Sequence, residues 1–278
     1  IAICITPLLL PVILSSTLSR GALRMSKKKT IVKKLDSIQN FGAMNILCTD
    51  KTGTLTEDKI VLEKYLDVMG NEDLRVLKHA FLNAYFQTGL RSNIDEAVIN
   101  RGVEHGLEEL STKYTKIDEV PFDFSRRRLS VVVNDGNKTQ LITKGAVEEI
   151  LNISTMADFQ GSVSPITNAI KENIKKIAKD LNKQGLRVVA VCQKNNLDKT
   201  SGFGVSDEKN MVLIGFIGFL DPPKESAKSS IEKLGKNGIR VIVLTGDNVE
   251  VTKCVCDKVG IKSRKIVTGA QIDKLADL

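Results

Sequence analysis

The stretch "ILCTDKTGTLTED" at residues 46–58 decides the fold, because an apolar run ends abruptly in the polar pair Asp50–Lys51 and a Thr-Gly-Thr turn. A second apolar run, "IRVIVLTGDN" at 239–248, ends in the same way at Asp247. Short apolar runs bounded by turn residues are typical of buried strands. In open parallel sheets, ligands bind beyond the carboxyl ends of the strands. We therefore expect Asp50 and Asp247 to face one crevice.

The residues of this crevice are suited to phosphoryl transfer. Gly53 and Gly246 let backbone N–H groups approach an anion closely. Asp50 supplies a carboxylate that can attack a phosphoryl group, with Lys51 and threonine hydroxyls beside it. Such a transfer needs positioning, a cation clamp and Mg²⁺ to offset negative charge. A bare Asp-x-x-Gly would indicate only a polar turn after a strand, whereas the nine-residue "CTDKTGTLT" is far more specific.

Composition limits the class of protein. A chain of 278 residues with 42% hydrophobic content can form more than one domain. It has no Trp and 4% aromatic residues, which argues against stacking on single-stranded nucleic acid. The net charge of +8 is concentrated in one segment without acids, which holds Arg20, Arg24, Lys27, Lys28, Lys29, Lys33 and Lys34. We therefore predict no nucleic-acid partner.

The five cysteines predict reduced thiols in a cytosolic compartment, because their number is odd and no CxxC pair occurs. Cys254 and Cys256 have no second Cys or His cluster nearby, so a metal site there is disfavoured.

The first 19 residues, "IAICITPLLLPVILSSTLS", are uncharged and predict a truncated membrane span. The basic block that follows indicates that the chain from about residue 20 onward faces the cytoplasm. A buried helix of a soluble protein is the alternative. Pro7 and Pro11 would break such a helix, but they suit an unwound span that lines an ion path.

Between about 59 and 220, strands and helices alternate with many turn signals. Asp135–Gly136 lies between two apolar runs and predicts a tight β-hairpin. The stretch "NAIKENIKKIAKDLNKQG" places four isoleucine and leucine residues at 4-3-4 spacing, which predicts an amphipathic helix ending at Gly185. We further expect helices at 79–87 and 93–103, and buried strands at 186–193 and 211–220.

Asp221-Pro222-Pro223 closes this insert. We expect Asp221 to cap a helix whose first turn contains Pro222, and whose inner face carries Ala227, Ile231 and Leu234. A strand at 239–245 and a helix at 251–259 follow, and this succession predicts a parallel sheet. A parallel α/β domain thus begins near residue 26, is interrupted by the insert, and resumes to the end.

"CTDKTGTLT" resembles, in full, the phosphorylation signature of P-type ATPases. The resemblance implies that Asp50 becomes an aspartyl phosphate and that Lys51 neutralises the transferred phosphate. It also implies that Thr52 offers a backbone carbonyl to Mg²⁺ and a hydroxyl to the phosphoryl oxygens, so that Asp50 and Thr52 form the metal site. "LTGDN" is similar to a second family motif, in which Thr245, Gly246 and Asp247 would hold the phosphate.

The insert carries further resemblances, to the nucleotide site of the family. Lys144-Gly145-Ala146 resembles a loop whose lysine lies along the adenine pocket. Phe124 matches the aromatic residue that stacks on adenine. The other matches are Arg126 for an arginine that reaches the nucleotide, Asp95 for an acid near the adenine amino group, and Arg187 for an arginine that reaches the phosphates. No GxxxxGK[ST] occurs, so a Walker-type loop is excluded as the ATP site.

The resemblance implies an α/β fold, with a haloacid-dehalogenase-like parallel-sheet phosphorylation domain interrupted by an α+β nucleotide-binding domain and preceded by part of a transmembrane helix. The predicted segments are 1–25 for the helix and basic flank, 26–58 and 221–278 for the two parts of the phosphorylation domain, the second incomplete, and 59–220 for the nucleotide-binding domain. The implied cofactors are ATP and Mg²⁺.

Longer stretches point to a subfamily. "SKKKTIVKKLDSIQNFGAMNILCTDKTGTLTEDKI", "DEVPFDFSRRRLSVVV", "KGAVEEIL" and "GFLDPPKESA" resemble the bacterial magnesium-importing P-type ATPases. One departure is Leu8, which stands where these pumps usually carry a glutamate, so an oxygen ligand for a hard cation is lost. A pump for another cation, Ca²⁺ or H⁺, is the alternative.

The TGE-type dephosphorylation motif and the GDGxND segment are missing from the sequence, so we expect a fragment that binds ATP weakly and does not turn over alone. Its expected partners are the transported cation, the lipid bilayer of the cell membrane, and the remaining transmembrane and actuator parts of a multi-pass pump. A haloacid-dehalogenase-type phosphatase would normally carry a second Asp at the position of Thr52. A non-catalytic nucleotide-binding or scaffold protein is disfavoured by the intact Asp50, Lys51 and Asp247.

Overall fold

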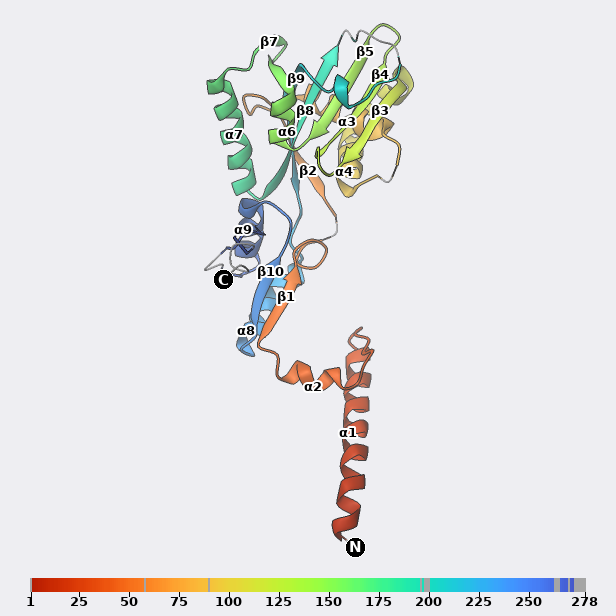
Figure 1. The fold of residues 1–278 in the computed structure, drawn as a ribbon, viewed down its shortest axis with the longest axis vertical. Coiled ribbons are helices and arrows are strands. Elements are labelled where there is room, and N and C mark those ends of the chain that lie inside the picture. Colours follow the sequence, from red (N-terminus) through yellow and green to blue (C-terminus); the bar gives the residue numbers. More distant parts are fainter. Residues whose placement is uncertain are drawn as a thin grey trace. The chain divides into compact units, whose positions relative to one another are not determined.

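A computed structural model describes residues 2–57, 59–89, 91–195, 197, 201–262, 266–269 and 271–272, with only the backbone for residues 2–8 (Figure 1). The chain divides into two compact units. The first comprises Ile1–Thr49 and Ile231–Val243, and the second comprises Asp50–Ser230 and Leu244–Leu278. We describe each unit by itself.

The first unit contains helices α1 (Ala2–Ser26) and α2 (Ser37–Gly42), and a two-stranded sheet of β1 (Ile46–Asp50) and β10 (Arg240–Leu244). The backbone N–H of Arg240 donates to the carbonyl of Asn45 at 2.9 Å. Because these residues stand at the beginnings of their strands, β1 and β10 start at the same edge, as the sequence predicts for parallel strands. Helix α8 (Glu225–Lys236) contributes residues to both units.

The unwound segment predicted around Pro7 and Pro11 is wrong, because α1 is a continuous helix from Ala2 to Ser26. Each proline removes only its own backbone donor, and the helix continues on both sides. Across the part of the chain that the structure describes, no helix combines the length and apolar character that a membrane crossing requires. The predicted span at 1–19 includes Ile1 and the side chains of residues 2–8, which lie outside the described part.

The prediction that β1 and β10 are buried is also wrong in this structure. Exposed positions alternate along both strands; Ile46 is 39% exposed and Leu244 is 59% exposed. The physical reason is that the described part of this sheet has two strands, which bury little apolar surface without a layer packed on each face.

The second unit is built on an eight-stranded mixed sheet with the order β3-β4-β5-β8-β9-β6-β7, in which β2 also pairs with β9 (Figure 1). In the described residues, β6 and β9 pair in parallel, and the other neighbouring strands in this order pair antiparallel. Its strands are β2 (Val61–Asp67), β3 (Thr115–Asp123), β4 (Arg128–Asn134), β5 (Thr139–Gly145), β6 (Ser154–Phe159), β7 (Ser162–Pro165), β8 (Leu186–Asn195) and β9 (Met211–Leu220).

Helices cover both faces of this sheet. Val131 and Val133 of β4 pack in a core with α3 and α4, whereas Val132 packs in a second core with α6 and α7. This alternation follows from the two-residue period of a strand, and it explains why the central strands are apolar throughout. The helices of this unit are α3 (Leu74–Phe86), α4 (Asn93–Glu104), η1 (Leu107–Glu109), α5 (Leu110–Lys113), α6 (Val147–Ile153), α7 (Asn168–Lys183), η2 (Val205–Asp207) and α9 (Val249–Lys258).

Several predictions of local structure are confirmed. Strands β4 and β5 pair as an antiparallel hairpin around Asp135–Gly136. Helix α7 is capped by Thr167, buries Ile174, and is followed by Gly185 with a φ of +89°. The helices predicted at 79–87 and 93–103 correspond to α3 and α4, and the strands predicted at 186–193 and 211–220 correspond to β8 and β9.

The prediction that Asp221 caps a helix and that Pro222 lies in its first turn is wrong, because α8 begins only at Glu225. Residues 222–224 instead pair with residues 55–57, and we call these two segments the linker ribbon. The N–H of Glu57 donates to the carbonyl of Pro222 at 2.8 Å, and the N–H of Lys224 donates to that of Leu55 at 2.9 Å. A proline has no N–H, so extended pairing through its carbonyl is a conformation that suits it.

Candidate functional site

The candidate phosphorylation site is organised around the side chain of Lys51. This side chain is only 3% exposed, and its Nζ lies 2.8 Å from Asp221 Oδ2 and 2.6 Å from Asp247 Oδ2. Burial alone would lower the pKa of Lys51, but the hydrogen bonds and charges of Asp221 and Asp247 outweigh it and raise the pKa. Lys51 is therefore a fixed positive charge between two carboxylates.

The loop after Lys51 is a tight turn around the Lys51 carbonyl. This carbonyl accepts from the N–H of Leu55 at 3.0 Å and from the N–H of Thr56 at 3.2 Å. Gly53 has a φ of +72°, a conformation that favours glycine, and its N–H donates to Thr56 Oγ1 at 3.3 Å. The Thr-Gly-Thr sequence thus folds back at once after the strand.

The other predicted residues flank Lys51 and Asp247 in the sequence and are exposed. Asp50 and Thr52 are exposed, and Asp50 Oδ1 accepts from the N–H of Lys51 at 2.7 Å. Thr245 and Gly246 are exposed too, and Thr245 Oγ1 accepts from the N–H of Asp247 at 3.2 Å. The structure therefore brings the ends of the two predicted strands together through Lys51.

The sequence did not indicate one hydrogen-bond acceptor beside Lys51, the Oδ1 atom of Asp221. Oδ1 of Asp221 is buried and has no hydrogen-bond partner among the described residues, while Oδ2 is bound to Lys51. A buried carboxylate oxygen without a partner is costly, and such atoms occur where a ligand completes the contact. The Asp-Pro-Pro motif gave no signal for this role, because it resembles a helix start.

The candidate nucleotide residues lie toward one end of the three neighbouring strands β4, β5 and β8. Gly145 at the end of β5 pairs with Arg128 at the start of β4 and with Ala190 in the middle of β8. The turn before β4 carries Phe124 and Arg126, and the second residue of β8 is Arg187. The antiparallel order of β4, β5 and β8 is what gathers these predicted residues.

Lys144 and Asp95, predicted separately, form a buried ion pair in which Lys144 Nζ contacts Asp95 Oδ1. Asp95 lies at the start of α4, where its Oδ2 also accepts from Ser92 Oγ at 2.7 Å and from the N–H of Ser92 at 3.0 Å. Burial would raise the pKa of Asp95, but the charge and hydrogen bond of Lys144 lower it below its usual range. The pair fixes the side chain of Lys144 near the end of β5.

Gly145 is required by close packing rather than by its own backbone angle. A Cβ built there would lie 2.5 Å from Arg128 Cβ and 2.7 Å from the carbonyl oxygen of Arg127. The same carbonyl accepts from the N–H of Ala146 at 3.0 Å. The Lys-Gly-Ala sequence therefore lets the turn before β4 lie directly on the end of β5.

Phe124 and Arg187 are presented to solvent. The ring of Phe124 is 89% exposed and meets Phe122 edge-on with ring centroids 5.3 Å apart. Arg187 is exposed, and no ion pair to it occurs in the described part of the chain. An exposed aromatic ring and an unpaired arginine at one end of β4, β5 and β8 suit a planar, anionic ligand.

Arg126 is held by a residue that the sequence did not single out. Its Nη1 donates to Glu208 Oε2 at 2.8 Å and to Oε1 at 3.0 Å, and its Nη2 donates to the carbonyl of Pro121 at 2.7 Å. Glu208 follows η2 in a polar loop, "SDEKN", where nothing in the pattern distinguishes one acid from its neighbours.

The structure describes the side chains of four of the five cysteines. Cys48, Cys192, Cys254 and Cys256 are free thiols, although Cys48 is exposed rather than buried. No group of three or more His, Cys, Asp or Glu side chains arranged for a metal occurs among the residues whose placement is described.

Comparison with known proteins finds similarity to P-type ATPases. The family model "P-type ATPase, cytoplasmic domain N" matches residues 87–226. The whole chain is 47% identical to "Magnesium-transporting ATPase, P-type 1" of Escherichia coli K12 and 44% identical to a protein of that name from Salmonella typhimurium LT2. It is 29% identical to "Calcium-transporting ATPase 1" of Bacillus cereus.

The chain covers 31% of the length of the two magnesium-transporting relatives and 33% of the calcium-transporting one. The matched family model spans half of the chain and covers the end of β4, β5 and β8 at which the predicted nucleotide residues gather. The protein belongs to the P-type ATPase family.

Proposed function

We propose that this chain is the catalytic cytoplasmic portion of an ATP-driven cation pump, and that Asp50 is the residue that receives the phosphoryl group. The observation that carries the proposal is Lys51, held between Asp221 and Asp247 directly beside the exposed Asp50 carboxylate. A buried lysine with two acidic partners is fixed in place, so its charge can neutralise a phosphoryl group without reorganisation.

The proposed reaction is an in-line displacement. A carboxylate oxygen of Asp50 attacks the γ-phosphorus of ATP, and an oxygen–phosphorus bond forms. The bond from the γ-phosphorus to the bridging oxygen breaks, and ADP leaves with the electron pair. Thr52 carries no carboxylate and offers no general acid for hydrolysis of the acyl phosphate, which favours a pump over a haloacid-dehalogenase-type phosphatase.

The residues around Lys51 fit Mg²⁺ as the cofactor. Mg²⁺ takes one or two carboxylates with water and phosphate oxygens, so Asp50 and the carbonyl of Thr52 suit it. The unpaired Oδ1 of Asp221 adds an acceptor for a water of such an ion. When bound, the ion would offset the charge that builds up on the phosphoryl oxygens. We also propose that the phosphorylation domain has a haloacid-dehalogenase-like fold.

ATP is proposed to bind at the end of β4, β5 and β8 where the candidate nucleotide residues lie. There Phe124 would stack on adenine, the Lys144–Asp95 pair would line its pocket, and Arg126 and Arg187 would face the phosphates. The exposure of Phe124 supports this assignment, since a large aromatic side chain that is 89% exposed contributes little to the stability of the fold.

The cargo is proposed to be Mg²⁺, and Ca²⁺ is the second candidate. Identity to the magnesium-transporting relatives is 44–47%, against 29% for the calcium-transporting one. Leu8 in place of a glutamate leaves the intramembrane ligands to other segments of the pump. Residues 1–19 are proposed to belong to a membrane span of that pump, which the exposed Leu9, Leu10, Val12 and Ile13 of α1 support.

The test is phosphorylation of the full-length pump in membranes by γ-labelled ATP. We expect an acid-stable, hydroxylamine-labile label in the unaltered protein and none in Asp50→Asn. Asp257→Asn is the matched control, because Asp257 is an exposed acid on the neighbouring helix α9. The level of label is followed while Mg²⁺, Ca²⁺, Na⁺ and pH are varied.

The outcomes separate the candidates. With the Mg²⁺–ATP complex held at a fixed saturating level, a label that changes with free Mg²⁺ alone assigns the cargo as Mg²⁺, and a response to Ca²⁺ assigns the second candidate. Label that persists in Asp50→Asn, or that never forms in the unaltered pump, contradicts the aspartyl-phosphate mechanism. Either result would favour a phosphatase-like enzyme or a scaffold protein.

A further inference from the structure

We propose that Glu208 is a positioning residue for nucleotide binding, which it serves by holding Arg126 and the turn that carries Phe124. The inference rests on the proposed nucleotide site. Glu208 has a side chain that is 0% exposed, and among the residues predicted to bind the nucleotide it contacts Arg126. Its role is therefore to act through other residues.

The carboxylate of Glu208 accepts from three different side chains. Arg126 Nη1 donates to both oxygens at 2.8 and 3.0 Å, Arg128 Nε donates to Oε2 at 2.7 Å, and Ser130 Oγ donates to Oε1 at 2.6 Å. Ser130 Oγ lies in turn 2.7 Å from Thr143 Oγ1 on β5. One buried acid thus ties the start of β4 to the loop before β9.

From Arg126 the contacts continue to the turn between β3 and β4. Arg126 Nη2 donates to the carbonyl of Pro121, and the N–H of Arg126 donates to Asp123 Oδ1 at 3.0 Å. Asp123 Oδ1 also accepts from the N–H of Ser125 at 2.8 Å. Phe124 lies inside this turn, so the direction of its exposed ring depends on the guanidinium that Glu208 fixes.

A charged acceptor is needed at position 208. The side chains of Arg126 and Arg128 are 17% and 11% exposed, so two like charges are partly withdrawn from water beside each other. A glutamine there would offer one oxygen and would point an N–H group at a donor. Without the carboxylate the two arginines repel each other, and the more exposed Arg126 is expected to swing outward.

A purely electrostatic role predicts the opposite result. If Glu208 acted only as a negative charge near the ligand, its removal would tighten binding of the ATP anion and leave the uncharged adenosine unaffected. If Glu208 positions Arg126 and the turn of Phe124, its removal weakens both ligands.

The experiment compares Glu208→Gln with the unaltered 278-residue chain in titrations with ATP and with adenosine, followed by NMR chemical shifts. We expect affinity for ATP to fall about tenfold, as when charge-assisted contacts that orient a side chain are lost, and affinity for adenosine to fall as well. The same change is then made in an Arg126→Gln background. There it is expected to add little to the loss of ATP affinity, since Glu208 acts through Arg126.

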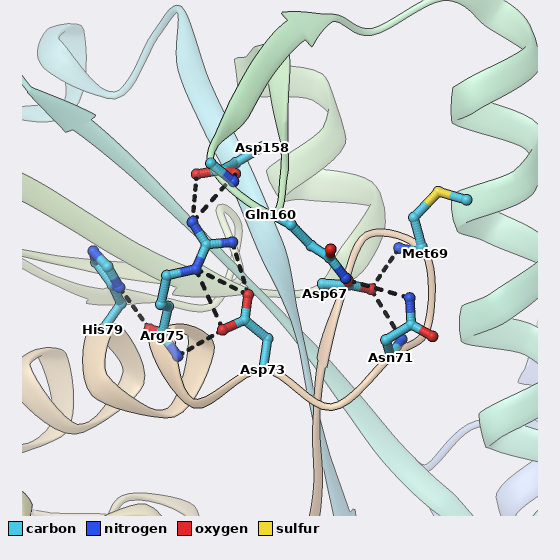
Figure 2. Close-up of polar contacts among 9 residues, drawn as sticks. Asp67, Met69, Asn71, Asp73, Arg75, His79, Asp158 and Gln160 are labelled. Atoms are coloured by element: carbon cyan, nitrogen blue, oxygen red, sulfur yellow. Dashed lines mark hydrogen bonds and ion pairs between the residues drawn. The ribbon is translucent and has the colours of Figure 1, made fainter.

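Asp158→Asn is the matched control. Asp158 is also a buried acid that holds an arginine, since its Oδ2 lies 3.2 Å from Arg75 Nη1, but it belongs to a different polar network (Figure 2). We expect Asp158→Asn to lower thermal stability while both affinities stay unchanged. Thermal melts of every variant ensure that binding is measured on folded protein.

Three outcomes overturn the inference while the proposed function stands: unchanged affinities in Glu208→Gln, tighter ATP binding with unchanged adenosine binding, or an equal loss in both Arg126 backgrounds. An unaltered chain that binds neither ligand overturns the proposed nucleotide site itself, and the inference with it.

Discussion

The ammonium of Lys51 lies 2.8 Å from a carboxylate oxygen of Asp221, which is 170 positions away in the sequence. The contact joins the end of β1 to the segment that follows β9. With Asp247 on its other side, Lys51 connects three separate stretches of the chain through one side chain.

Lys51→Met is expected to destabilise the chain by about 3 kcal/mol, the lower end of the cost of removing one partner of a buried ion pair. The reason is that Asp221 and Asp247 would face each other without a cation. Urea unfolding followed by far-UV circular dichroism measures the effect. Lys253→Met, at an exposed position of α9, is expected to stay within about 0.5 kcal/mol of the unaltered chain. Equal effects of the two changes would contradict the role of Lys51.

Phe124→Ala is expected to leave stability within about 0.5 kcal/mol, because the ring is exposed. It should weaken ATP binding by about 1–3 kcal/mol, the usual worth of stacking a base on an aromatic ring. Phe122→Ala, near the end of β3, is the control. ATP affinity that depends on Phe122 and not on Phe124 would show that the wrong ring was assigned.

Gly145→Ala is expected to destabilise the chain by about 1–3 kcal/mol, because its Cβ would overlap the backbone before β4. The displaced turn should also weaken ATP binding. Gly235→Ala is the contrasting variant, since Gly235 lies in α8 with nothing within 4 Å of its added Cβ. It should gain about 0.5–1 kcal/mol from helix propensity. A neutral Gly145→Ala in the same melts would mean that the close approach is absent in solution.

Stability is expected to fall as the pH is lowered from 7 to 5, in part because of His79. Burial lowers the pKa of His79, while its contacts to the carbonyl of Arg75 at 2.6 Å and to Gln193 Oε1 at 2.8 Å oppose this only in part (Figure 2 shows the contact with Arg75). Since the folded pKa lies below the unfolded value of about 6.5, the unfolded state takes up more protons as the pH falls. The stability that a neutral His79 contributes is fully present above that value.

Denaturant unfolding at several pH values measures this slope. His79→Gln should reduce it, by at most about 1.4 kcal/mol per pH unit for one proton. His105→Gln, which changes the chain's only other histidine at an exposed position, is the comparison variant. If both variants behave alike, His79 is not the group responsible.

Local features of the sheet could be predicted because the signals are short in range. The period of α7 and the Asp-Gly turn between β4 and β5 each depend on neighbouring residues alone. The meeting of Lys51 with Asp247 could also be predicted, since topology puts the ends of parallel strands together. The chemical roles of these residues remain predictions.

Other features depend on distant partners and carry no local signal. Asp221 reads as a helix cap, yet its carboxylate is bound by Lys51, and the two prolines after it enter the linker ribbon instead of a helix. Glu208 is one acid in a polar loop, and only the fold reveals its two arginine partners. The apolar character of β1 suggested burial, but burial depends on a covering layer that no strand supplies for itself.

The linker ribbon has a consequence for the modularity of the chain. Val61 and Leu220 lie opposite each other on β2 and β9, so the 59–220 segment leaves and re-enters at neighbouring points. A module whose two ends already meet adds little loop-closure entropy to its host. We therefore predict that this segment can be transplanted as one piece, or excised and replaced by a short link, without altering the strands on either side.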